Sequence, residues 1–179
     1  SASSDVYKRQ AEMEPELAQR INATGPAHLA RVAAQHKVSL VHVSTDYVFD
    51  GHASTPYSEQ SPTHPLSVYG VTKLAGEEAV SAALPSAIIV RTAWVFSEYG
   101  TNFVKTMLRL GKERDALGIV GDQKGCPTYA GDLAQAIIDL LLKKAAGGIY
   151  HYSGDKEVSW YQFAEAIFAV AQQKGVITK

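Results

Sequence analysis

The sequence predicts an α/β fold built around a parallel sheet. Short runs rich in apolar and β-branched residues lie at 38–44, 87–92 and 148–152. The first two runs are apolar at most positions, which is typical of strands covered on both faces. Segments with helical spacing of apolar residues lie between and after these runs. Because helices and short buried strands alternate along the chain, we expect parallel strands joined by helices.

The helices are expected where apolar residues recur with the helical period, at 14–36, 67–83, 101–112, 130–144 and 160–173. In the first of them Gly25-Pro26 interrupts the pattern and is expected to kink the helix. Ser159, followed three positions later by Gln162, resembles a capping box at the start of the last helix. A fourth short strand is expected at 117–120, and the proline-rich segment 45–65 is expected to be a loop.

Composition narrows the classes of partner. The 179 residues include 17 Lys+Arg and 18 Asp+Glu, for a formal net charge of -1, which argues against a nucleic-acid partner. No apolar run approaches the roughly 18 residues that a membrane span needs, so we expect no membrane partner. The single cysteine, Cys126, fits a reducing compartment and hence a cytoplasmic location. The histidine spacings match no ligand pattern, so no metal site is predicted.

The first ten residues differ in character from the rest of the chain. Residues 1–10 are polar and lack a clear period, and the pattern changes at Ala11. We interpret 1–10 as a leader that is either not native to the protein or a disordered end.

Four side chains in the middle of the sequence suggest proton-transfer chemistry. Ser44 and Thr45 end a predicted strand, at the sheet edge where α/β proteins bind ligands. Tyr69 and Lys73 are four positions apart and therefore share one face of a helix. The lysine ammonium is expected to lower the pKa of the Tyr69 phenol, which would then serve as a general acid. Tyr-x-x-x-Lys alone also fits a pair on the surface of a helix. The strand-end Ser44-Thr45, the run at 46–51 and the proline-rich loop precede it in order, and this favours proton-transfer chemistry.

Several segments match a known family. They are 21–29, 43–51 (with Ser-Thr-Asp-Tyr-Val-Phe-Asp-Gly), 67–77 (with Tyr-Gly-Val-Thr-Lys), 91–96 (Arg-Thr-Ala-Trp-Val-Phe), 102–104 and 121–128. From about Ala11 to its end, the chain resembles the extended short-chain dehydrogenase/reductases. Within them it is similar to the dTDP-4-dehydrorhamnose reductase family.

The resemblance implies a fold, a reaction and partners. The fold would be a partial Rossmann-like parallel sheet at 11–96 with a small C-terminal substrate-binding lobe at 97–179. The family reduces the 4-keto group of dTDP-4-dehydro-β-L-rhamnose to dTDP-L-rhamnose with NADPH or NADH, for polysaccharide biosynthesis. Members are often dimeric, and magnesium has been associated with some, so the resemblance leaves a homodimer and a Mg²⁺ requirement open.

The resemblance also assigns roles by position. The catalytic residues would be Thr45, which binds the keto oxygen, Tyr69, which donates the proton, and Lys73, which holds the nicotinamide ribose. Further cofactor contacts would come from Asn22, Ser44 and Thr92, and further substrate contacts from Tyr47, Trp94 and Asn102.

One departure from the family pattern is clear. The family begins with a glycine-rich strand-turn-helix that holds the cofactor pyrophosphate on backbone N–H groups, and no such motif occurs in this sequence. We therefore expect that N-terminal βα units of the family fold are missing. We also expect that the chain alone binds dinucleotide poorly, is inactive or nearly so, and exposes a strand edge and apolar faces.

Two alternatives remain open. Other nucleotide-sugar epimerases and dehydratases share the hydroxyl, tyrosine and lysine set, although dehydratases usually place further acidic residues after the strand-end hydroxyl. Relatives of this family also serve as non-catalytic regulatory subunits of methionine adenosyltransferase. The presence of Thr45, Tyr69 and Lys73 favours an enzyme.

Overall fold

The computed structural model describes residues 4–177, and their side chains from residue 8 onward. These residues form two compact units. One, here called the sheet unit, comprises Tyr7–Thr92 and Ala134–Tyr152. The other, here called the helix-pair unit, is built mainly from Ala93–Leu133 and the segment after Tyr152.

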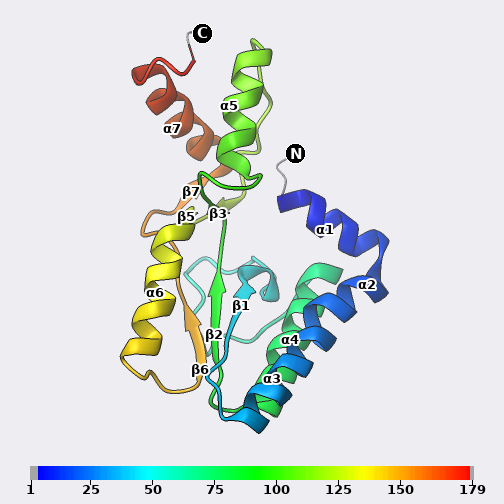
Figure 1. Cartoon of the computed structure of the whole chain (residues 1–179). Helices are drawn as coiled ribbons and strands as arrows, with labels where there is room; N and C mark the ends of the chain where they lie inside the picture. Colours follow the sequence, from blue (N-terminus) through cyan, green and yellow to red (C-terminus); the bar gives the residue numbers. More distant parts are fainter. Residues whose placement is uncertain (1–3, 178–179) are drawn as a thin grey trace. The chain divides into compact units, whose positions relative to one another are not determined.

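The sheet unit contains the parallel sheet that the sequence predicts. Its strands are β1 (Val41–Thr45), β2 (Ile88–Thr92) and β6 (Gly148–His151), in the order β1-β2-β6 (Figure 1). The register places Thr45 opposite Thr92, so the carboxyl ends of β1 and β2 coincide. β1 is an edge strand in the described part of the chain, and Val43 on it is 43% exposed.

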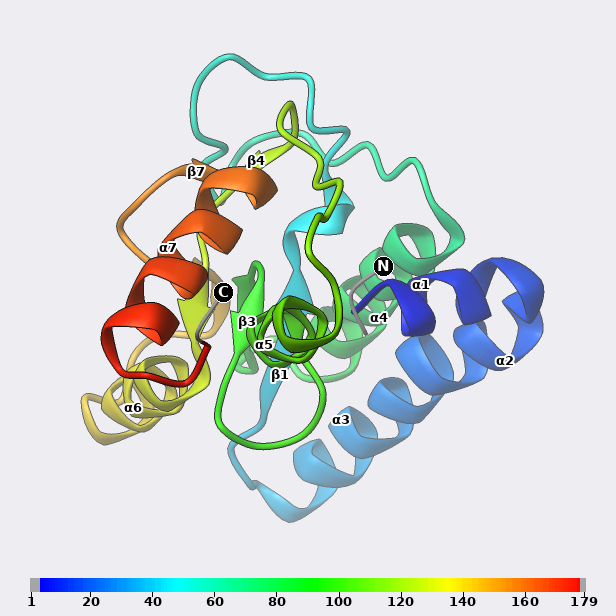
Figure 2. The same ribbon diagram turned by 90° about the horizontal axis from the view of Figure 1, so that it is seen from above.

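Helices cover the sheet. The bounds are α1 (Ser4–Met13), α2 (Pro15–Gln19), η1 (Arg20–Thr24), α3 (Gly25–His36), η2 (Asp46–Val48), α4 (Val68–Ala83) and α6 (Ala130–Leu142). Figures 1 and 2 show α3 beside α4 on one side of the sheet, with α6 on the other side. Ala30, Val80 and Ile89 form the buried core between α3, α4 and β2.

The interruption at Gly25-Pro26 takes the form of a π-helical turn. The N–H of Gly25 bonds to the carbonyl of Arg20, five residues back, instead of the usual four. Pro26 has no N–H to donate to the carbonyl of Asn22, so the regular α-helical bond is lost there. A Cβ on Gly76 of α4 would lie 2.1 Å from that carbonyl, so only glycine permits the close approach of α4 to η1.

The helix-pair unit packs α5 (Phe103–Glu113) against α7 (Trp160–Gln173) around Met107, Ala164 and Ile167. Short strands join its loops. These are β3 (Val95–Phe96) with β5 (Thr128–Tyr129), in parallel, and β4 (Lys124–Gly125) with β7 (Val158–Ser159), antiparallel. The capping box predicted for Ser159 and Gln162 is confirmed, with bonds of 2.8 and 3.1 Å.

One sequence expectation meets a different structure. The strand expected at 117–120 is wrong, because Ile119 packs onto the core of α5 and α7 and the carbonyl of Val120 accepts a bond from the N–H of Tyr161 at 3.0 Å. In a run of four residues, the apolar pattern of a loop that packs on two helices cannot be told from that of a strand. The interpretation of 1–10 as a leader stays a prediction: residues 4–10 belong to α1, and residues 1–3 lie outside the described chain.

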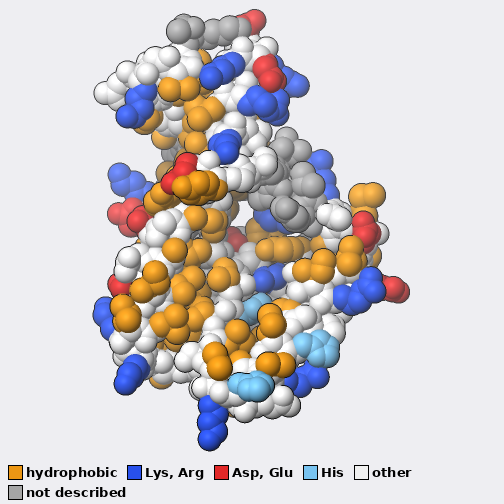
Figure 3. Space-filling model, in the orientation of Figure 1, with side chains coloured by type: hydrophobic (Ala, Val, Ile, Leu, Met, Phe, Trp, Pro, Cys, Tyr) orange, Lys and Arg blue, Asp and Glu red, His pale blue; other side chains and the backbone are white. Residues whose placement is uncertain are grey.

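Some apolar side chains on α6 are open to solvent. Ile138, Leu141 and Leu142 are 47%, 40% and 76% exposed, and Figure 3 shows apolar side chains gathered over this helix. Within residues 4–177, every helix is too short or too polar to cross a bilayer.

Candidate functional site

Thr45 stands at the carboxyl end of β1 and begins the first turn after it. Its extended backbone lets the side-chain oxygen accept a bond from the N–H of Tyr47 at 3.2 Å, which caps η2. The hydroxyl also donates to Oδ1 of Asp46 at 3.0 Å. Burial raises the pKa of the Asp46 carboxyl, and the Thr45 hydroxyl opposes this by stabilising the charged form. Thr45 is thus fixed from two sides and only 7% exposed.

Tyr69 lies in the first turn of α4 and reaches Thr45. The side chain of Ser67 caps this helix by accepting a bond from the N–H of Gly70 at 3.1 Å. Gly70 lets the turn approach the loop after β1, because a Cβ there would lie 2.2 Å from the carbonyl oxygen of Tyr47. The Thr45 hydroxyl lies beside the Tyr69 phenol, and the Tyr47 ring meets Tyr69 edge-on at 5.8 Å between centroids.

The structure does not show the lowered pKa that the sequence predicts for Tyr69. Burial raises the pKa of this phenol, and the nearby Thr45 hydroxyl opposes that rise only in part. The Lys73 ammonium is not among the groups that shift it. The expectation is therefore wrong for the described structure, because four positions on a helix bring two side chains to one face without fixing where their ends lie.

Lys73 instead reaches the outer edge of β1. Its Nζ donates to the carbonyl of Val43 at 2.7 Å. The carbonyl of Leu40 bonds to Ile88, so alternate residues from 40 on face β2 and Val43 faces away from it. Burial lowers the pKa of Lys73, and the carboxylate of Glu77, one turn further along α4, opposes this.

A buried charged network joins α4 to both strands beneath it. The Glu77 carboxylate accepts bonds from Nε and Nη2 of Arg91, the latter at 2.6 Å, and from the Ser44 hydroxyl at 2.5 Å. The residue exposures are 2% for Glu77 and 4% for both Arg91 and Ser44. The sequence analysis did not identify Glu77 or Arg91. An arginine inside the buried run 87–92 was the available signal, since buried charges require a partner.

The remaining residues that the sequence predicts for cofactor binding have different surroundings. The Ser44 hydroxyl is engaged by Glu77, so its predicted cofactor contact stays untested. The Asn22 amide, in η1, donates to the Thr72 hydroxyl at 3.0 Å. The Thr92 hydroxyl, at the end of β2, is buried and has no hydrogen-bond partner among the described residues. An orphaned hydroxyl beside Thr45 in the register is a feature of a ligand site.

Two predicted substrate contacts, Trp94 and Asn102, belong to the helix-pair unit. The Asn102 side chain caps α5 by accepting a bond from the N–H of Lys105 at 3.1 Å and donates to the carbonyl of Ser97 at 2.6 Å. Trp94 stacks on Trp160 with centroids 3.4 Å apart. The structure therefore brings Thr45, Tyr69 and Tyr47 together within one unit and places Trp94 and Asn102 within the other.

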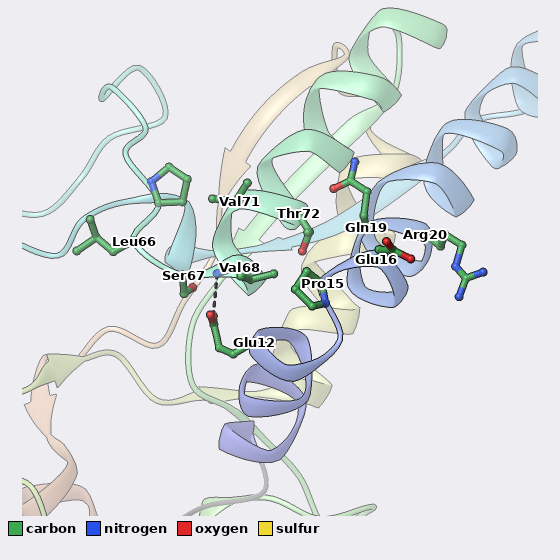
Figure 4. Close-up of a pocket in the computed structure, with 11 residues that line it drawn as sticks. Glu12, Pro15, Glu16, Gln19, Arg20, Leu66, Ser67, Val68, Val71 and Thr72 are labelled. Atoms are coloured by element: carbon green, nitrogen blue, oxygen red, sulfur yellow. Dashed lines mark hydrogen bonds between the residues drawn. The ribbon is translucent and has the colours of Figure 1, made fainter.

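A separate cavity of about 840 Å³ lies beside the start of α4. Figure 4 shows Glu12 bonded to the N–H of Val68 across it, at 2.7 Å, with Leu66, Val71 and Thr72 among the lining residues. Thr45, Tyr69 and Lys73 do not line this cavity. It is therefore not the site that the catalytic residues would form.

Comparison with known proteins shows the family of the chain. A family model described as the RmlD substrate binding domain matches residues 4–178. The chain belongs to this RmlD family. It is 52% identical over 171 residues to a dTDP-4-dehydrorhamnose reductase of Aggregatibacter actinomycetemcomitans, covering 92% of this chain and 58% of that protein. It is 44% identical to the enzyme of the same name from Salmonella typhimurium, covering 98% of this chain and 60% of that protein.

Solved structures of the RmlD family have the same fold. The dTDP-4-dehydrorhamnose reductase of Bacillus anthracis, in complex with NADP, matches with a TM-score of 0.89 at 43% identity over 92% of this chain and 59% of that chain. The Clostridium acetobutylicum protein matches with a TM-score of 0.88 at 44% identity, over 90% of this chain and 57% of that chain. The chain thus spans a little under 60% of these relatives' length.

Proposed function

We propose that this chain carries the proton-transfer residues and the sugar-nucleotide lobe of a reductase acting on dTDP-4-dehydro-β-L-rhamnose. The observation that supports this most is the placement of the Tyr69 phenol, in the first turn of α4, beside the Thr45 hydroxyl at the end of β1, with Lys73 one turn further along the same helix. The membership in the RmlD family and the names of the relatives point to the same reaction.

In the proposed reaction, Thr45 and Tyr69 act on the same substrate oxygen. Their hydroxyls lie on the same side of the site, so a 4-keto oxygen placed between them would receive a hydrogen bond from each. Burial keeps the Tyr69 phenol protonated at neutral pH, which is the form that an acid needs. As the keto carbon gains a hydride, the C=O double bond opens and the Tyr69 proton joins the oxygen, giving an alcohol. NADPH or NADH supplies this hydride when bound.

The chain's residues fit one end of such a cofactor. Lys73 and the orphaned hydroxyl of Thr92 are suited to the nicotinamide ribose. The ammonium would exchange its bond to Val43 for ribose hydroxyls. The sequence holds no glycine-rich turn for the pyrophosphate, so we propose weak dinucleotide binding by this chain alone. Among the described residues no cluster of three or more acidic, His or Cys side chains suits a metal ion, so we assign no step to Mg²⁺.

The test compares two proteins. One is this chain, and the other is this chain fused to the N-terminal segment of the A. actinomycetemcomitans relative that it does not cover. We expect NADPH oxidation with dTDP-4-dehydro-β-L-rhamnose in the fusion and little or none in the chain alone.

In the fusion, Tyr69→Phe should lower kcat by about 10²–10⁴-fold, the usual contribution of a general acid. Tyr161→Phe, on the half-exposed face of α7, is the matched control and should keep full activity. Undiminished turnover in Tyr69→Phe would remove the proposed acid. Light scattering of the same preparations tests the homodimer that the resemblance leaves open, and the cytoplasmic location stays a prediction.

A further inference from the structure

Trp94 has an unusual backbone conformation. Its φ is +48°, in the left-handed region that bulky side chains rarely adopt. Two other described residues that are not glycine share this feature, Lys37 and Lys144, and both follow the end of a helix, where such a conformation is common. Trp94 instead lies between β2 and β3, so helix termination does not account for it. A strained conformation away from a helix end persists only where its surroundings hold it, and such residues cluster at ligand sites.

The surroundings that hold Trp94 are visible in the helix-pair unit. The ring of Trp160 lies nearly parallel to that of Trp94, at 10°, with centroids 3.4 Å apart. A Cβ on Gly125 would lie 2.4 Å from Cε2 of Trp94 and 2.7 Å from both Cζ2 and Nε1. Because Trp160 already lies directly over one face of the indole, Gly125 occupies the other face. The indole of Trp94 is thus enclosed on both faces.

Local structure explains how these two residues come together. β4 pairs with β7 so that Gly125 lies opposite Val158, two positions before Trp160. Trp160 is anchored in turn by Phe103 of α5, at 4.6 Å between ring centroids. The backbone of Trp94 is held by a bond from the N–H of Thr128 to its carbonyl, at 3.2 Å.

We propose that Trp160 and Gly125 are positioning residues for the sugar-nucleotide site. They hold Trp94 so that it contacts the sugar of the dTDP-sugar through the edge of its indole, with the Nε1–H as a donor to sugar oxygens. This inference rests on the proposed function. A ring already held in place loses no further rotamer freedom on binding, and that loss otherwise weakens affinity by roughly two- to tenfold.

The chain offers a direct probe, because Trp94 and Trp160 are its two tryptophans. Two indoles this close couple excitonically and alter each other's absorption and circular dichroism bands. The wild-type indole bands should therefore differ from the sum of those of Trp94→Phe and Trp160→Phe, and Tyr161→Phe should keep the wild-type bands. Wild-type absorption and circular dichroism that both equal this sum would show that the rings do not stack and would overturn the proposal.

Binding is measured by calorimetry on the chain itself with dTDP and with dTDP-L-rhamnose. We expect Trp160→Ala and Gly125→Ala to lower the affinity for dTDP-L-rhamnose by about three- to tenfold and the affinity for dTDP by less than twofold. Trp160→Phe, which keeps a ring on that face, should recover part of the loss. Gly118→Ala, where an added Cβ meets nothing within 4 Å, is the control for the glycine change and should bind like the wild type.

The outcomes separate the two proposals. An equal loss of affinity for both ligands would overturn the positioning role alone. So would an unchanged affinity for dTDP-L-rhamnose in both Gly125→Ala and Trp160→Phe. If the wild-type chain binds neither ligand, the proposed substrate class fails, and this inference fails with it. Because Trp160→Phe and Gly125→Ala are small changes, they keep the test decisive even where Trp160→Ala does not fold.

Discussion

Removal of the Glu77 carboxylate should be among the most damaging single changes in the sheet unit. In Glu77→Ala, Arg91 would keep its charge while losing every acceptor that the structure gives it. The guanidinium is buried, and its Nη1 already has no partner among the described residues. Breaking a buried ion pair from one side typically costs about 3–5 kcal/mol, and the enclosure of this pair favours the upper part of that range.

The assay is urea unfolding followed by circular dichroism, with stability taken from the midpoint and slope. Glu113→Ala is the matched control, because Glu113 also pairs with an arginine, Arg109, at 2.8 Å, yet their side chains are 51% and 60% exposed. An exposed pair contributes about 0–1 kcal/mol, so Glu113→Ala should leave the free energy of unfolding nearly unchanged.

The double change Glu77→Leu with Arg91→Met separates charge from packing. Replacing both partners with apolar residues should restore much of the stability, because no buried charge is then left unpaired. A loss below about 1 kcal/mol in Glu77→Ala, or a double variant no more stable than Glu77→Ala, would refute this reasoning.

Three further predictions concern the same unit. Burial lowers the pKa of His42 to about 4, so the unfolded chain, whose histidine titrates near 6.5, takes up this proton first as the pH falls. Stability should therefore decline from pH 7 to 4, by about 1–2 kcal/mol after allowance for solvent screening, and urea midpoints for His42→Gln should decline less. Gly70→Ala should destabilise by about 1–3 kcal/mol because its Cβ meets the backbone of Tyr47, whereas Gly25→Ala, with its nearest atom at 3.4 Å, should not; equal melting temperatures would contradict this. Ser67→Ala removes the cap of α4 and should cost about 1 kcal/mol in the same unfolding assay, and an unchanged midpoint would show the cap to be dispensable.

The elements that the sequence predicts correctly are those whose signals are local. Ser159 and Gln162 lie within one turn and mark the start of α7 whatever packs on it. The interruption at Gly25-Pro26 is local as well, although its form as a π-turn depends on which carbonyls find a donor. The segment 117–120 carries no comparable signal, and its partners on α5 and α7 decide its conformation.

The candidate site was predictable in its members and less so in its interactions. Thr45 and Tyr69 lie near each other because one ends a strand and the other begins the helix packed on it. The pKa of Tyr69 depends on burial, which arises from the whole fold. The use of Ser44 by Glu77 depends on a contact between residues 33 positions apart, which no short pattern records.

The π-turn of η1 bears on how this chain is compared with others. It is equivalent to one additional residue within a helix, and each residue advances about 100° around the helix axis. Every side chain after Gly25 is therefore rotated by that amount relative to a regular helix continued from α2. The small residues that α3 buries, Ala27, Ala30 and Ala33, face the core only because of this rotation. A homologous helix without the turn would need a one-residue gap between Arg20 and Gly25 before its inward-facing positions correspond to these alanines.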